Sequence, residues 1–173
     1  MDCATAHEVP LEFVVGTGDP EQPVFEPLPE DGAADLFPGS QGGYHVYMQV
    51  RARGLCPNRV LYTRKLREPG ETDVIRSQTE KVPMVDGGDG FWVLPRAQPT
   101  FVCPSNTPGV AMAGRDLELE VTLEEDLLEE DAALPGLADG PRSMTQLLIL
   151  RPTCAPSDTV CQESTDIGCA APE

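Results

Sequence analysis

The chain has 173 residues, a length that fits one domain. Its eighteen prolines and sixteen glycines favour many short elements joined by turns and argue against a helical bundle. The net charge of −17 argues against nucleic acid as a partner, because phosphate binding needs clustered Lys and Arg.

The first 40 residues predict one strand and a long connection. Residues 11–15 form a short apolar run that Gly16, Gly18 and Pro20 close as a turn. Residues 19–40 are rich in Pro, Glu, Asp and Gly, so we expect a draped connection with at most one short edge strand.

Residues 44–53 carry the clearest pattern, because apolar and polar side chains alternate with a period of two. This pattern predicts a half-buried strand. The set expected to face the core is Tyr44, Val46, Met48, Val50 and Ala52. The set expected to face outward is His45, Tyr47, Gln49, Arg51 and Arg53.

Further strands are predicted at residues 60–66, 74–85, 91–94, 100–103, 117–123 and 144–150. The acidic residues that follow position 123 predict a long hairpin loop, with a short helix as the alternative. About seven to nine strands with turns between them are typical of an all-β, immunoglobulin-like or fibronectin-like antiparallel sandwich. We therefore expect a sandwich over residues 11–153, an amino-terminal arm at 1–10 and a cysteine-containing tail at 154–173.

Basic residues gather in the middle of the chain, with eight of the twelve lying between Arg51 and Lys81. Two interpretations stay open: an ion-paired sheet face between acidic flanks, or ordinary solvated charge.

The six cysteines indicate an oxidising compartment, because they are even in number, widely spaced and without a CxxC pair. They are Cys3, Cys56, Cys103, Cys154, Cys161 and Cys169. A Cys56–Cys103 bridge is the first pairing we expect, which would leave Cys3 to pair within the tail group. The sequence alone does not decide the connectivity.

Export requires a leader, and no apolar leader segment follows Met1. We expect that one has been removed and that the protein lies outside the cell, in the periplasm or on the outer surface of a bacterium. Cys3 could then carry a lipid anchor instead of forming a disulfide. No stretch approaches the roughly 20 apolar residues of a membrane-spanning helix.

One segment carries a family resemblance. Residues 39–46, with the sequence GSQGGYHV, follow Gly16-Thr-Gly18 and the segment Phe25-Glu-Pro-Leu28. Together these resemble uncharacterised exported β-sandwich proteins of myxobacteria and their relatives, loosely over residues 11–123. The resemblance implies the fold and export, and it brings no activity.

Catalysis is not expected. A hydrolytic triad needs a histidine base, and the chain has only His7 and His45, with no GxSxG turn. A dinucleotide site is also unsupported, because Gly16-Thr-Gly18 lacks the third glycine of the motif and runs into Pro20.

Two non-catalytic functions remain open. The first is a binding or structural module for an unknown protein or envelope component, using the outward set His45, Tyr47, Gln49, Arg51 and Arg53, since Tyr and Arg are enriched at binding hot spots. The alternative is a copper- or calcium-binding envelope protein that uses His45, Asp86 and Asp89 or the acidic loop at 124–131.

Overall fold

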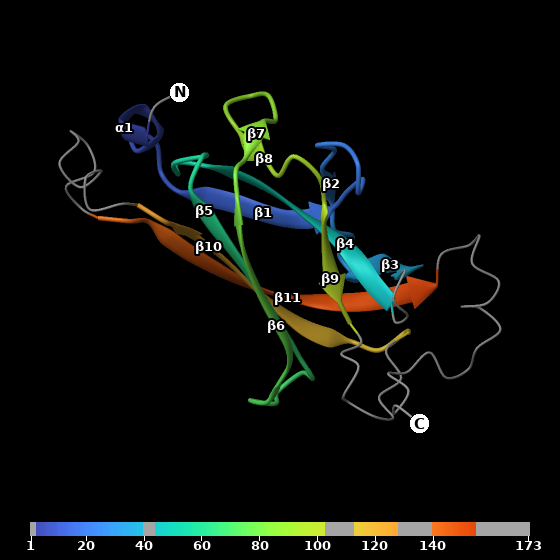
Figure 1. The fold of residues 1–173 in the computed structure, drawn as a ribbon. Helices are drawn as coiled ribbons and strands as arrows, with labels where there is room; N and C mark the ends of the chain where they lie inside the picture. The colour runs from blue at the N-terminus through green and yellow to red at the C-terminus, as the bar shows by residue number, and fades with distance from the viewer. Residues whose placement is uncertain (1–2, 40–43, 103–112, 128–139, 155–173) are drawn as a thin grey trace.

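The computed structural model describes residues 3–39, 44–102, 113–127 and 140–154 (Figure 1). The elements are α1 (Cys3–Ala6), β1 (Glu12–Thr17), β2 (Glu26–Pro27), β3 (Ala33–Pro38), β4 (Tyr44–Arg53), β5 (Val60–Arg67), β6 (Val74–Val82), β7 (Val85–Asp86), β8 (Trp92–Val93), β9 (Gln98–Phe101), β10 (Leu117–Glu125) and β11 (Ser143–Cys154). The all-β class expected from the sequence is confirmed. Apart from the four-residue α1, every described element is a strand.

The strands form one mixed sheet instead of the two antiparallel sheets expected from the sequence. Its order is β2-β1-β4-β3-β11-β10-β5-β6, with β8 and β9 also paired to β4, and β7 to β8. The described pairs are antiparallel except β3 with β11, which run parallel with Ala33 opposite Arg151 and Leu36 opposite Cys154. The immunoglobulin-like arrangement is therefore not shown.

β3 explains this difference. The sequence analysis placed residues 33–38 inside a connection, but β3 pairs with β4 at its end and with β11 along its length. It lies between the two halves of the sheet and joins them. Ala34 and Leu36 are buried there, an alternation that is masked in the sequence by the surrounding Pro, Asp and Gly.

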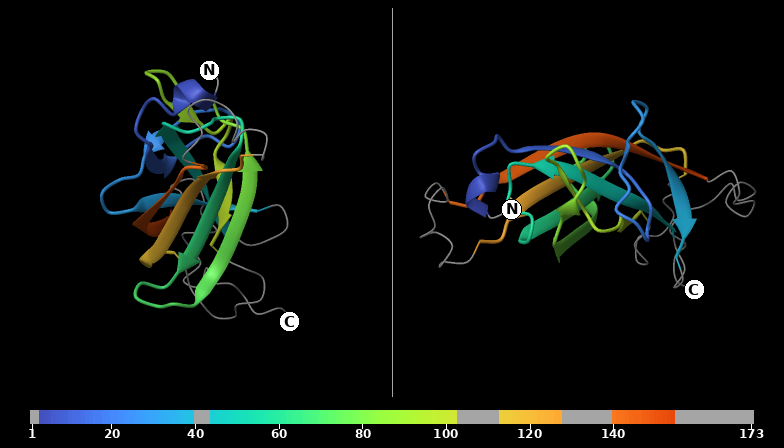
Figure 2. Two further views of the ribbon diagram at one scale, coloured as in Figure 1. Left: turned by 90° about the vertical axis from the view of Figure 1, so that its left-hand side faces the viewer. Right: turned by 90° about the horizontal axis from the view of Figure 1, so that it is seen from above.

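The core lies between the two halves, because the sheet bends back on itself (Figures 1 and 2). The inward set of β4 is confirmed: Val46, Met48, Val50 and Ala52 are fully buried, and Tyr44 packs against the same cluster. Residues 62 and 66 of β5 and the alternating apolar residues of β10 complete it. Two-residue periodicity thus predicted which side chains meet in the interior.

Ion pairs connect β5 and β10 on the outer face, which confirms the first interpretation of the basic middle segment. Lys65 donates to Glu120 at 2.9 Å, and Arg67 pairs with both Glu118 and Glu120. The hydrogen bond from Lys65, together with Arg67, lowers the pKa of Glu120. These charges are therefore largely neutralised within the sheet.

The described part of the predicted arm is packed onto the sheet, since Ala6 of α1 is buried and Arg142 binds the carbonyls of His7 and Val9. None of the described helices is long and apolar enough to span a membrane. Cys56 and Cys154 are disulfide-bonded, although no bridge has both of its cysteines among the described side chains. The expected Cys56–Cys103 bridge involves a residue outside the described part, as do the pairings of Cys3, Cys161 and Cys169, so the connectivity stays a prediction.

Candidate functional site

The outward set of β4 does not form the open stripe that its alternation predicted. His45 is 6% exposed and Gln49 is fully buried, while Tyr47, Arg51 and Arg53 are half-buried. The reason is that other segments lie over this face of β4. The outward face of β4 therefore has three parts, its middle and its two ends.

In the middle of this face, the Gln49 side chain bonds to the backbone of Leu94 in the way that a neighbouring strand would. Its side-chain Nε2 donates to the carbonyl of Leu94 at 3.1 Å, and its Oε1 accepts from the Leu94 N–H at 3.0 Å. Leu94 lies between β8 and β9, where backbone pairing with β4 is interrupted. Because a buried amide with all these bonds made stabilises one arrangement, Gln49 has a structural role.

At one end, two arginines share the ring of Phe91. The guanidinium carbons of Arg51 and Arg53 lie 4.3 and 5.0 Å from the ring centroid. Arg53 also binds both carboxylate oxygens of Glu12, at 3.0 and 2.9 Å, and Arg51 pairs with Asp89 at 3.6 Å. Arg51 and Arg53, two of the predicted binding residues, thus already make cation–π contacts and ion pairs within the chain.

At the other end, three rings gather where β3 meets β4. The ring centroid of Tyr47 lies 4.7 Å from that of His45 and 5.2 Å from that of Phe37. Burial lowers the pKa of His45, which favours the neutral imidazole. Of the predicted binding face, Tyr47 also lines a cavity.

This cavity, the β4 pocket, has a volume of about 380 Å³. It is lined by Thr17, Gly18, Glu26, Pro27, Pro29, Ala33, Ala34, Asp35, Phe37, Val46, Tyr47 and Thr153. The lining therefore comes from β1, β2, β3, β4 and β11, and it combines aromatic rings, carboxylates and hydroxyls. A volume in this range suits a small ligand or one side chain of a partner.

Two glycines allow the β1–β2 connection to approach closely enough to form one wall of the pocket. A Cβ on Gly16 would lie 2.1 Å from the carbonyl oxygen of Glu26, and one on Gly18 would lie 2.2 Å from that of Val24. Any side chain at these two positions would push the connection away. The glycines that resembled a nucleotide loop therefore position Glu26 at the pocket.

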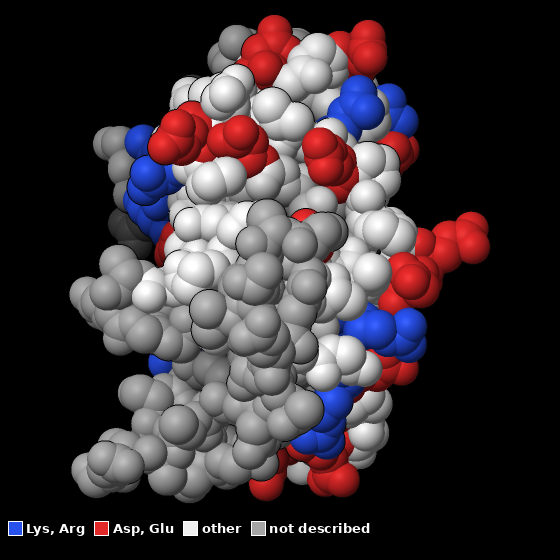
Figure 3. Space-filling view, turned by 90° about the vertical axis from the view of Figure 1, so that its right-hand side faces the viewer, with Lys and Arg blue, Asp and Glu red and all other residues white. Residues whose placement is uncertain are grey.

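The pocket lining has a negative charge. Glu26 and Asp35 are the charged residues of the described lining, and both are exposed. Figure 3 shows the side of the molecule that is on the right in Figure 1. Acidic side chains are spread over its upper part, and the basic ones lie mainly toward its margins. The carboxylates of Glu26 and Asp35 therefore favour a cation over an anion at the pocket.

A second, smaller cavity of about 300 Å³ lies between residues 28–30 and the outer face of β1 and β11. Val14, Leu148 and Ile149 make it mainly apolar. It offers no grouping of polar side chains comparable to the β4 pocket.

Two buried polar groups were not predicted from the sequence, and the first surrounds Arg64. This side chain on the inner face of β5 is 1% exposed. It donates to the carbonyl of Pro99 at 3.0 Å and to the hydroxyl of Thr100 at 3.2 Å, and it pairs with Glu80. Arg64 therefore holds β9 against β5 and β6 across the interior.

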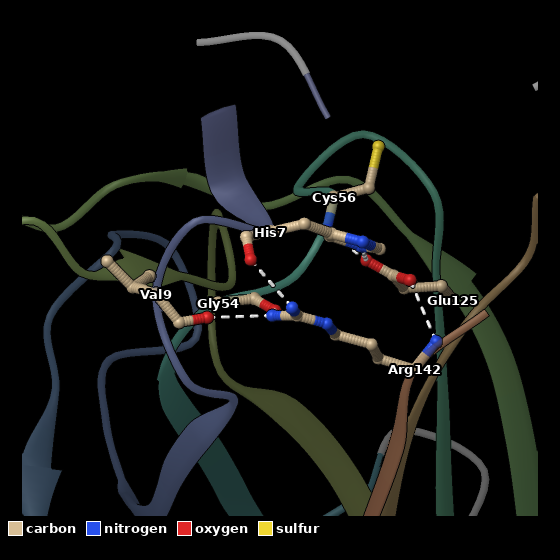
Figure 4. Close-up of polar contacts among 6 residues, drawn as sticks. All are labelled: His7, Val9, Gly54, Cys56, Glu125 and Arg142. Atoms are coloured by element: carbon tan, nitrogen blue, oxygen red, sulfur yellow. Dashed lines mark hydrogen bonds and ion pairs between the residues drawn. The ribbon is translucent and has the colours of Figure 1, made fainter. Parts of the chain in front are cut away.

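The second group, the amino-terminal polar cluster, surrounds Glu125 (Figure 4). The Glu125 carboxylate accepts from His7 Nε2 at 2.7 Å, from the backbone N–H of Cys56 at 2.6 Å and from that of Arg142 at 2.8 Å. The Arg142 guanidinium donates to the carbonyls of His7, Val9 and Gly54 at 2.7 to 2.8 Å. The cluster thus fastens the amino-terminal arm to the sheet.

The metal alternative is not supported by the described residues. Within residues 3–39, 44–102, 113–127 and 140–154, no three His, Cys, Asp or Glu side chains are grouped so as to hold a metal ion. His45 lies against Tyr47, Asp86 accepts from the backbone of Gly88 at 2.8 Å, and Asp89 pairs with Arg51. The three predicted ligands are therefore not brought together, and part of the acidic loop at 124–131 lies outside the described chain.

Comparison with known proteins finds no relatives: no protein-family model, no curated protein and no solved structure matches this chain. The resemblance to exported proteins of myxobacteria stays a prediction from the sequence.

Proposed function

We propose that this chain is a non-catalytic binding module, exported to the bacterial periplasm or cell surface, and that the β4 pocket is its ligand site. The observation that supports this most directly is the pocket itself. It joins an aromatic pair, Phe37 and Tyr47, to exposed carboxylates in one concave surface of about 380 Å³. Concave sites with a few convergent polar groups are where ligands usually bind.

The buried polar groups favour binding over catalysis as the role. His7 contacts Glu125 inside the amino-terminal polar cluster, whose other members are backbone groups and the Arg142 side chain, and His45 packs edge-on against Tyr47. Disulfide-bonded Cys56 and Cys154 agree with export, because such bonds persist in oxidising compartments. A structural role in an envelope assembly is compatible with the same features.

A fragment screen followed by two-dimensional amide NMR spectra tests the proposal. We expect the amide signals of Gly18, Phe37 and Tyr47 to shift together with the hits, and Phe37→Ala to abolish those shifts. Val74→Ala is the matched control, because Val74 is similarly exposed (44% against 38%) but lies on β6, outside the pocket. Hits that cluster elsewhere, or that keep their affinity for Phe37→Ala, would overturn the proposal.

A further inference from the structure

We infer that the β4 pocket binds a basic side chain, the guanidinium of Arg or the ammonium of Lys, presented by a partner protein. This inference rests on the proposed function and adds the chemical class of the ligand. It is carried by the charge of the pocket, by the positions of the chain's own cations, and by a comparable arrangement at the other end of β4.

The two carboxylates of the pocket have no cation beside them within the described residues. Glu26 and Asp35 are the charged members of the described lining, and neither takes part in an ion pair there. Two exposed negative charges beside one cavity repel each other, so a bound cation stabilises both. The pocket is therefore complementary to a positive group.

Most of the chain's own basic side chains are used elsewhere. All twelve Lys and Arg residues lie within the described residues, and none of them lines the pocket. Eight of them are ion-paired with other carboxylates, and Arg142 binds three backbone carbonyls. The cation that the pocket suits must then come from another molecule.

The same strand shows how such a cation is held. Near one end of β4, the Phe91 ring and the carboxylates of Glu12 and Asp89 together hold the guanidinium groups of Arg51 and Arg53. The other end of β4 also combines aromatic rings with carboxylates, since Phe37, Tyr47, Glu26 and Asp35 line the same pocket. Ring faces and carboxylates both attract guanidinium and ammonium groups. A basic side chain from a partner would reproduce this arrangement intermolecularly.

The test is a titration of the whole protein with tripeptides, followed by the amide NMR signals of Gly18, Phe37 and Tyr47. The probes are acetyl-Gly-Arg-Gly-amide, its Lys counterpart, and acetyl-Gly-citrulline-Gly-amide, which has nearly the shape of the Arg peptide without its charge. We expect the Arg and Lys peptides to bind at least about fivefold more tightly than the citrulline peptide. High salt should remove most of that difference.

Matched variants locate the effect. Glu26→Gln with Asp35→Asn should reduce the affinity for the Arg peptide to that for citrulline, whereas Glu21→Gln with Glu71→Gln should leave it unchanged. Both pairs alter the net charge equally, and all four residues are exposed, so folding should be retained in both. A loss of affinity in both pairs would overturn the inference, because only the overall charge would then matter.

The peptides also separate this inference from the proposed function. Equal binding of the Arg and citrulline peptides at the pocket would overturn the inference and leave the pocket as a binding site. Shifts from none of the peptides would also overturn the inference, and the fragment screen would then decide the proposed function independently.

Discussion

His7 and Glu125 are 118 residues apart in the chain, yet His7 Nε2 and Glu125 Oε1 lie 2.7 Å apart, with both side chains almost completely buried. The same carboxylate binds the backbone N–H groups of Cys56 and Arg142. One side chain thus connects the arm, the β4–β5 connection and the start of β11.

Replacing Glu125 by Ala should destabilise the protein by about 3 kcal/mol, because it leaves the buried N–H of Cys56, the partly buried N–H of Arg142 and the His7 ring without their acceptor. The adjacent Glu124 is exposed, so Glu124→Ala should change the free energy of unfolding by less than about 0.5 kcal/mol. Urea unfolding of both variants measures the difference. Similar losses in the two variants would contradict a special role for Glu125.

Arg64→Ala should also cost about 3 kcal/mol, because it removes the bonds to Pro99 and Thr100 and leaves a cavity between β5 and β9. Arg96→Ala is the control, since Arg96 is exposed. Hydrogen exchange adds a local readout: the amides of β9 should lose protection in Arg64→Ala. If β9 keeps its protection, Arg64 does not hold that strand.

Tyr62 should make stability depend on alkaline pH, because burial raises its pKa to about 12. The value in the unfolded chain is about 10. The folded-state pKa is the higher one, so this contribution is complete below pH 10 and is lost as the pH rises toward 12. Since the Tyr62 hydroxyl has no hydrogen-bond partner among the described residues, Tyr62→Phe should be as stable as the parent at pH 7. The free energy of unfolding of both proteins is measured from pH 8 to 11.5. If it changes with pH by the same amount in the two, the prediction is wrong.

His45 should make the protein less stable as the pH falls into the acidic range. Burial lowers its pKa below 6.5, so the unfolded chain takes up the proton first and stability falls as the pH drops below about 6.5. His45→Gln cannot take up this proton, and its melting temperature should fall less between pH 7.5 and 5. A ring-proton titration with a midpoint above 6.5 would show the prediction to be wrong.

Metal ions should leave the melting temperature unchanged. A ligand that binds only the folded state raises apparent stability, and the described residues contain no group of three metal ligands. Melts with calcium, with copper and with a chelator check this, with magnesium as a control for ionic strength. A rise with calcium alone would point to the acidic loop at 124–131.

The sequence predicted the strands and their inward faces best where one local pattern decides the outcome. The bounds of β4 agree with the alternating segment at 44–53, and Val46 and Met48 are in the core. The position of β3 could not be predicted in the same way. Its role is set by partners on β4 and β11 that are distant in the chain, and its own six residues carry only two buried side chains, Ala34 and Leu36.

The candidate site was predicted only in part for the same physical reason. Alternation predicts which side chains point away from the core, but it does not predict which other segments of the chain cover those side chains. Tyr47 was identified as a binding residue, whereas its companions Glu26, Asp35 and Phe37 come from a segment interpreted as connection. Gln49 was expected to face outward because no local signal indicates that Leu94 pairs with its amide.

The parallel pairing of β3 with β11 also bears on how fast this protein folds. Thr153 and Ala34, which share a hydrogen bond across this pair, are 119 residues apart, so closing that loop has a large entropic cost before any contact is gained. Hairpins such as β5–β6 and β10–β11 are far more local and can form first. We therefore expect slow folding, on the order of milliseconds to seconds, with the two half-sheets docking last.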